Sequence, residues 1–218
     1  MNKTPETNML KDTQKTPSSK PNESGYINVQ GHIKIYDPLT KEIFVNKKNA
    51  IHYENFSIAL ARGISNQGYG TIGEMSFGNG GTRVDQTGII TYLTPNTVGV
   101  NANLYNQTYT KVVDAKRETD LDPARNFMEV RHVLGMYYSD ILVSCLLDFG
   151  EPNGQAAFDN ATNTDGEFVF DEIGLRAYTE DGTGDLLTHV IFHPVQKSLN
   201  RLIQIDYTIR VQSLTSGN

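Results

Sequence analysis

The stretch Phe170–Val211 constrains the fold of this chain more than any other. From Ile203 to Val211 apolar and polar residues alternate strictly, which is the pattern of a strand with one buried face and one wet face. Two more strand patterns precede it, over residues 169–178 and 186–192, with a glycine-containing turn between them. We expect residues 194–200 to form a second connecting loop. The stretch is therefore predicted to form three consecutive antiparallel strands, a meander.

The rest of the chain contributes further strand patterns and one helix pattern. Alternation over residues 26–36, a proline-containing turn and a return over 42–45 predict a hairpin. Residues 137–147 are almost continuously apolar, which indicates a strand buried on both faces. Segment 51–64 is predicted to be helical, because four apolar residues at three- and four-residue spacing form one stripe: Tyr53, Phe56, Leu60 and Ile64. The prediction is a mainly β chain, an antiparallel β-sandwich or jelly-roll-like domain over residues 26–213 with one short helix.

Composition and charge argue against several classes of protein. The 218 residues carry a net charge of −6, whereas a nucleic-acid-binding surface normally needs a basic field. No apolar run approaches the roughly 20 residues of a membrane-spanning helix, so neither nucleic acid nor membrane is expected as a partner. A single cysteine excludes an intrachain disulfide framework. Residues 1–25 are polar, and we expect them to form an extended N-terminal arm that is flexible or bound to a partner.

Two patterns have the letters of functional motifs but the wrong structural context. Gly68, Gly70 and Gly73 match G-x-G-x-x-G, yet this loop follows a helix and enters a strand, the reverse of a dinucleotide site. His193 follows His189 by four positions within a strand pattern. Their Cα atoms should then lie about 13 Å apart, which is too far for one metal ion. We interpret both patterns as structural.

Two further candidates come from single residue types. Glu180, Asp181 and Asp185 gather three carboxylates in one loop that lacks the spacing of an EF-hand, so we interpret it as a turn and leave a surface calcium ion open. Cys145 lies inside the most apolar strand pattern and is expected to be a buried, inert thiol. No catalytic, cofactor-binding or metal-ligating residue is assigned, no cofactor is expected, and the chain is predicted not to be an enzyme.

Several phrases of the sequence follow one another in a characteristic order. They are Ile72–Thr82 after the helix, Glu172–Leu175, Leu186–Thr188, and Phe192–Lys197 leading into Ile205–Ile209. Together they resemble virion structural proteins of tailed bacteriophages, over roughly residues 27–211 and without the arm. The resemblance implies a non-enzymatic protein that is assembled into the virion in the host cytoplasm, with other virion proteins as partners.

Three functional hypotheses follow. The first is a capsid decoration (cement) protein that strengthens the shell through subunit interfaces, forms a homo-oligomer and lays the arm of residues 1–25 along a neighbour. The alternative is a neck, collar or baseplate ring protein of the same particle. A lesser alternative is a glycan-binding β-sandwich module, although the chain has no tryptophan for stacking on sugars. Its candidate binding residues would be Tyr105, Tyr109, Tyr137 and Tyr138.

Overall fold

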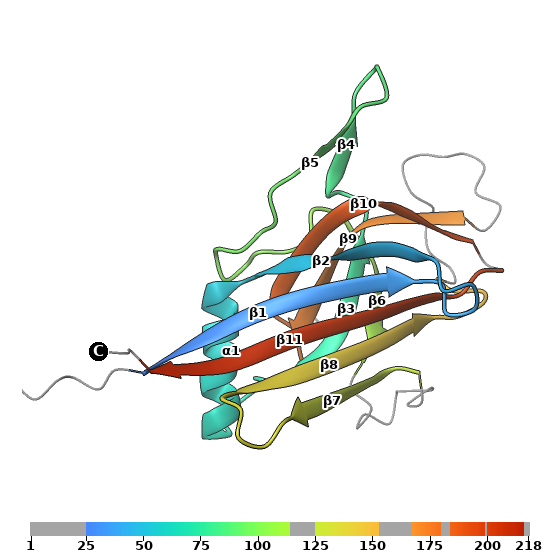
Figure 1. Cartoon of the computed structure of the whole chain (residues 1–218). Coiled ribbons are helices and arrows are strands. Elements are labelled where there is room, and N and C mark those ends of the chain that lie inside the picture. The colour runs from blue at the N-terminus through green and yellow to red at the C-terminus, as the bar shows by residue number, and fades with distance from the viewer. Residues whose placement is uncertain (1–24, 114–124, 153–166, 180–183, 199, 216–218) are drawn as a thin grey trace, which may run out of the picture.

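The computed structural model describes residues 25–113, 125–152, 167–179, 184–198 and 200–215. They form a mainly β fold with one helix, in which nine strands make a single antiparallel sheet in the order β6-β3-β9-β10-β2-β1-β11-β8-β7 (Figure 1). Two short strands, β4 and β5, make a separate hairpin. In chain order the elements are β1 Gly25–Tyr36, β2 Ile43–Ile51, α1 Tyr53–Ser65, β3 Ile72–Gly78, β4 Thr82–Val84, β5 Ile90–Tyr92, β6 Gln107–Val112, β7 Phe127–His132, β8 Tyr138–Leu147, β9 Glu167–Ala177, β10 Thr188–Ser198 and β11 Ile203–Thr215.

The sheet curls so that its two halves face each other across one core, as the layers of a sandwich do (Figure 1). Phe77 on β3 and Ile173 on β9 come from one half, and Leu147 on β8 and Ile205 on β11 come from the other. All four side chains are at most 1% exposed. This layering confirms the predicted antiparallel, β-sandwich-like fold class. The predicted arm lies almost wholly outside the described residues, since β1 begins at Gly25.

The predicted three-stranded meander is wrong. β9 and β10 do form a hairpin, but β2 and β1 lie between β10 and β11 in the sheet. β11 instead pairs with β1 along the whole length of β1 and with β8 on its other side. Two long partners give β11 more backbone hydrogen bonds and cross-strand contacts than a return beside β10 could offer. Alternation along one strand reports which face is buried and carries no information about the neighbouring strand.

The loop predicted over residues 194–200 is also wrong. β10 continues through Pro194 to Ser198, and its register against β9 shifts between Ile191 and Val195. Proline cannot donate to a ladder, and a bulge is one of the few places in a sheet that accepts it. The hairpin predicted at the start of the chain is confirmed, although β2 continues past Val45 to Ile51.

The helix is confirmed, and its apolar stripe is corrected. The ring nitrogen Nδ1 of His52 caps α1 by accepting a hydrogen bond from the backbone N–H of Asn55. Asn66 ends the helix in the left-handed conformation. The two ends of the predicted stripe, Tyr53 and Ile64, are 73% and 77% exposed. Only the middle of the helix packs against the curled sheet, so Asn55, Phe56, Ala59 and Leu60 carry its buried contacts.

Candidate interaction site

Two adjacent carboxylates on β9 are buried and bind the glycine-rich turn that follows β3. Glu172 is fully buried and accepts hydrogen bonds from the backbone N–H groups of Gly80 at 3.0 Å, Tyr105 at 2.9 Å and Asn106 at 2.8 Å. Asp171 accepts hydrogen bonds from the backbone N–H of Gly81 at 2.9 Å and from the N–H and hydroxyl of Thr82. The two buried carboxylates therefore hold the turn together with backbone hydrogen bonds, such as that from the N–H of Asn79 to the carbonyl oxygen of Asn106.

His189 completes this network, and its hydrogen bonds define its tautomer. Nδ1 lies 2.8 Å from the backbone nitrogen of Asn96, which can only donate, so Nδ1 is an acceptor. Nε2 must therefore carry the proton that it donates to Glu172 at 3.0 Å. The imidazole is neutral in this arrangement, because an accepting Nδ1 cannot also hold a proton. His189 thus orients Glu172 and anchors the loop around Asn96.

The network fixes the charge on Glu172. Burial alone raises the pKa of Glu172, but the hydrogen bonds from His189 and three backbone N–H groups outweigh it and hold the pKa below its usual value of 4.5. For Asp171 burial dominates and the pKa is raised. With four donors on Glu172, its acceptor capacity is used within the fold, which suits a structural anchor better than a general base.

This arrangement explains what several of the singled-out phrases have in common. The Ile72–Thr82 phrase provides the turn, the Glu172–Leu175 phrase provides an anchoring carboxylate, and the Leu186–Thr188 phrase precedes His189 directly. Gly174 closes the packing, because a Cβ there would lie 2.5 Å from Leu186 and 2.7 Å from the carbonyl oxygen of Thr188. The sequence alone did not reveal this contact, since an acidic pair and a glycine-rich turn about 90 residues apart have no spacing rule that connects them.

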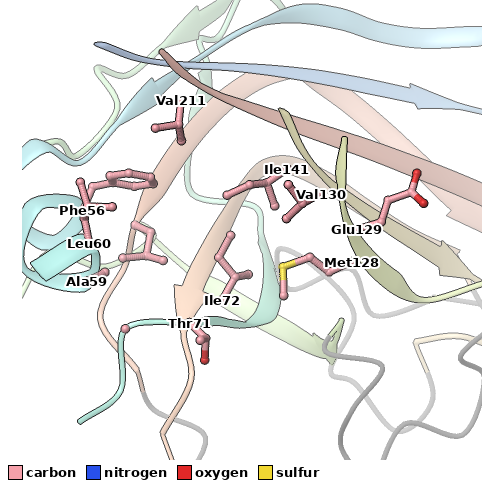
Figure 2. A pocket seen from close by; sticks show the side chains of 12 residues that line it. Phe56, Ala59, Leu60, Thr71, Ile72, Met128, Glu129, Val130, Ile141 and Val211 are labelled. Carbon is pink, nitrogen blue, oxygen red and sulfur yellow. The ribbon is translucent and has the colours of Figure 1, made fainter. Parts of the chain in front are cut away.

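An apolar pocket of about 430 Å³ opens between α1, the start of β3 and the outer strand β7. Phe56 and Leu60 from the helix face Ile141 and Val130 across it, and Glu129 directs its carboxylate away from it (Figure 2). Gly70 lines the pocket where the chain leaves α1, and a Cβ there would lie 2.3 Å from the carbonyl oxygen of Ala59. The G-x-G-x-x-G pattern is thus a close crossing of helix and loop, consistent with the structural interpretation.

Exposed apolar side chains gather on β7 and in the turn that follows it. The exposed fractions are 70% for Val130, 59% for Val133, 92% for Leu134, 46% for Met136 and 81% for Tyr137. Single exposed apolar residues are ordinary, but five within eight residues mark a surface that a partner can bury. With the neighbouring pocket, this surface is the strongest candidate interaction site in the described part of the chain.

The remaining sequence candidates are scattered. His193 lies on β10, as the strand pattern predicted, and its Nδ1 is 3.2 Å from the hydroxyl of Tyr92. Cys145 is fully buried in β8, as expected. Asp185 forms an ion pair with Arg62 at 3.7 Å, whereas residues 180–183 of the possible calcium loop lie outside the described residues. Among the residues described, no three His, Cys, Asp or Glu side chains gather as metal ligands.

The four tyrosines proposed for glycan binding do not share one platform. The hydroxyl of Tyr109 is 3.4 Å from Glu151, just past the end of β8, whereas Tyr137 and Tyr138 lie at the start of that strand. A strand of ten residues spans about 33 Å, so these rings cannot stack on one sugar. The hydroxyl of Tyr105 donates a hydrogen bond to the carbonyl oxygen of Thr94.

Comparison with family models, with curated proteins and with solved structures finds no match for this chain. The helix α1, the one helix in the described ranges, is too short and too polar to cross a membrane.

A buried lysine makes stability depend on pH. Lys197 is fully buried and donates to the carbonyl oxygens of Asp148 at 3.0 Å and Ser198 at 2.8 Å. Burial lowers the pKa of Lys197 to about 8, while Glu151 and Asp148 partly oppose this. Between that value and the unfolded value of 10.5, the unfolded chain binds more protons, so the free energy of unfolding rises with pH.

We expect Lys197→Met to remove this dependence. Between pH 8 and about 9.5 the wild-type protein should gain on the order of 1–2 kcal/mol of stability relative to the variant. Urea unfolding at several pH values below 10, where tyrosines remain protonated, measures the difference. Lys48→Met, at an exposed position, is the matched control and should show a difference that does not change with pH. A constant difference for Lys197→Met would contradict the depressed pKa.

Proposed function

We propose that this chain is a non-enzymatic structural component of a tailed-phage virion, a capsid decoration protein that stabilises the shell through subunit interfaces. It assembles with other virion proteins and with its own copies. The observation that carries the proposal is the apolar surface of β7 and the following turn, where Leu134 is 92% exposed. Such a surface is suited to burial in a permanent assembly. The resemblance of the sequence phrases to virion structural proteins suggests that this assembly is a phage particle.

The fixed loops support the same proposal. The segment after β5 is held by Glu172 through Tyr105 and Asn106 and by His189 through Asn96. Between these held points the segment presents the apolar side chain of Val98, which is 78% exposed. A preformed surface loses little conformational entropy on binding, which favours stable subunit contacts.

The copy number in the particle tests the proposal. The chain would be quantified in purified virions made from the genome that encodes it. We expect on the order of hundreds of copies for a shell protein, whereas about a dozen would indicate the neck, collar or baseplate alternative, in keeping with ring symmetry. Absence of the chain from purified virions would overturn the proposal.

Deletion of residues 1–24 tests the role of the arm. The truncated chain starts at β1, so we expect it to fold but to bind empty capsids more weakly and to dissociate at lower temperature. Co-sedimentation with capsids before and after heating measures retention. A chain whose first 24 residues are shuffled keeps the length and charge of the arm and serves as the control. Unchanged retention of the truncated chain would refute the arm contact.

A further inference from the structure

β7 is an outer strand whose free side is exposed. In the described sheet it pairs with β8 alone, and four of its six residues, Glu129 to His132, are exposed. The other outer strand, β6, differs, because five of its six residues are half-buried. Val130, near the centre of β7, is 70% exposed. An exposed edge with an apolar centre is a template for another strand.

A row of alternating charges crosses the outer face of the sheet and ends at this edge. Arg210 on β11 lies opposite Asp140 on β8, which in turn lies opposite Arg131 on β7. The guanidinium of Arg210 binds Asp140 at 2.7 and 2.8 Å. This hydrogen bonding, with a further contribution from Arg131, holds the pKa of Asp140 below its usual value. The row therefore reads cation, anion, cation, and it stops on Arg131 at the open edge.

We propose that β7 pairs antiparallel with β7 of a second copy of this chain, about a two-fold axis at Val130. In this register Val130 lies opposite Val130 of the second copy, and the residue numbers of every opposite pair add to 260. Glu129 of each copy therefore faces Arg131 of the other. The charge row continues across the axis with an anion, and Arg131 exchanges part of its contact with Glu129 on its own strand for one with the second copy. The surface is self-complementary, as a two-fold interface requires.

The charges select this register over its neighbours. A two-fold axis at Glu129 would place two carboxylates opposite each other, and an axis at Arg131 would do the same with two guanidinium groups. Charged residues on an edge strand commonly prevent pairing, but of the three registers with the axis at Glu129, Val130 or Arg131, only the one at Val130 places opposite charges together. Like charges directly opposite are destabilising, so the wrong registers are disfavoured.

The apolar surface adds area to the strand pairing. In the proposed register Val133 faces Phe127 of the second copy, which brings the exposed turn from Val133 to Tyr137 to the interface. Val130 lines the mouth of the pocket on the inner face of β7 (Figure 2). A two-fold axis perpendicular to the sheet keeps each face on its own side, so Val130 of the second copy lies beside the same pocket. Strand pairing alone would bury too little for a stable dimer, and covering the pocket and the apolar turn adds to the buried area.

Charge reversal and charge exchange test the interface in the full chain. We expect the wild-type protein to sediment as a dimer with a dissociation constant of about 100 µM or lower. Arg131→Glu places two carboxylates opposite each other at both ends of the contact and should weaken the dimer at least tenfold. Combining Glu129→Arg with Arg131→Glu exchanges the charges and should restore it. Circular dichroism of each variant checks the fold. A monomeric wild type, a dimeric Arg131→Glu variant, or an unrestored exchange variant would overturn the proposal.

A cross-link tests the register independently. Val130→Cys places two thiols opposite each other across the axis, within the reach of a disulfide after a small adjustment. Cys145, the one native cysteine, is fully buried and should not react. Val84→Cys, at a position that is 63% exposed on β4, is the control. Mild oxidation should give covalent dimers of Val130→Cys and few of Val84→Cys. Equal yields would contradict the pairing at Val130.

This inference rests on the part of the proposed function in which copies of the chain assemble with one another, and it names the surface. The two can fail separately. Absence of the chain from virions would overturn the function and leave the measured dimer intact. A monomeric purified chain would overturn the β7 interface without affecting a copy number measured in particles.

Discussion

Replacing Glu172 with alanine should cost about 3–5 kcal/mol of stability, which is a large share of the 5–15 kcal/mol typical of a folded protein. The substitution leaves three backbone N–H groups, those of Gly80, Tyr105 and Asn106, without their acceptor in a buried place. The ring N–H of His189 loses its partner as well. Urea unfolding at pH 7 should show a lower midpoint with an unchanged slope.

Two further variants separate the buried network from a general effect of losing a carboxylate. Glu172→Gln keeps the volume but exchanges one acceptor oxygen for a donor, so we expect a smaller loss than for alanine. Glu42→Ala removes a carboxylate that is 63% exposed in its pair with Arg201, and should cost less than about 1 kcal/mol. A loss for Glu172→Ala as small as that for Glu42→Ala would refute the anchoring role.

The effect of Glu172→Ala should shrink in acid. The folded-state pKa of Glu172 lies below its usual value of 4.5, so its contribution is present above that value and is lost as pH falls through the folded pKa. Asp171 has a raised pKa and the opposite sign, because burial disfavours its charged form. The burial of Asp171 is common to both proteins and cancels in their difference, and the charge of Glu172 is only the smallest cause of its raised pKa. Unfolding curves at pH 7 and near pH 3 measure the change.

The sequence predicted local structure well and strand neighbours poorly. The alternation that placed β11 was correct over Ile203–Val211, and the helix spacing placed α1 within two residues at its start. Both patterns depend only on which side chains face the core. The position of β11 between β1 and β8 depends on pairing between segments more than 50 residues apart, for which a single chain carries no local signal. The exposure of Tyr53 and Ile64, the two ends of the helix stripe, could not be predicted for the same reason: residue spacing does not show how much of a helix packs against the sheet.

The candidate site was less predictable than the fold. The sequence points to contacts through the arm but not to Val130 or Leu134, because a strand pattern does not distinguish an outer strand from an inner one. The reversed G-x-G-x-x-G context and the buried Cys145 were interpreted correctly, since each depended on a neighbouring strand or helix pattern. The sequence does not predict the contact between His189 and Glu172, because the two residues meet only when β9 and β10 form a hairpin.

Arg176→Met should be the second strongly destabilising change, at about 3–5 kcal/mol. Arg176 is 6% exposed, and its guanidinium joins β9 to several other segments. Its donors reach four acceptors: the hydroxyl of Ser76, the side-chain oxygens of Gln107 and Asn103, and the carbonyl of Gly184. Methionine fills much of the same volume, so the expected loss reflects lost hydrogen bonds rather than a cavity, above all those to the buried residues Ser76 and Gly184.

The geometry of the guanidinium, and not only its charge, should decide the result. Burial lowers the pKa of Arg176. The nearby carboxylates Glu74 and Asp185 oppose this effect, and the arginine remains charged in either case. Arg176→Lys keeps a cation whose single nitrogen cannot span acceptors on opposite sides, so it should lose roughly half as much stability as methionine. Arg201→Met is the matched control: Arg201 is 31% exposed, its partner Glu42 is 63% exposed and its contact with Asp37 is long at 3.7 Å, so its ion pairs should be worth less than about 1 kcal/mol. If Arg176→Lys were as stable as the wild type, a point charge would suffice there. The forked contacts would then not be what holds the loop before β6 against β9.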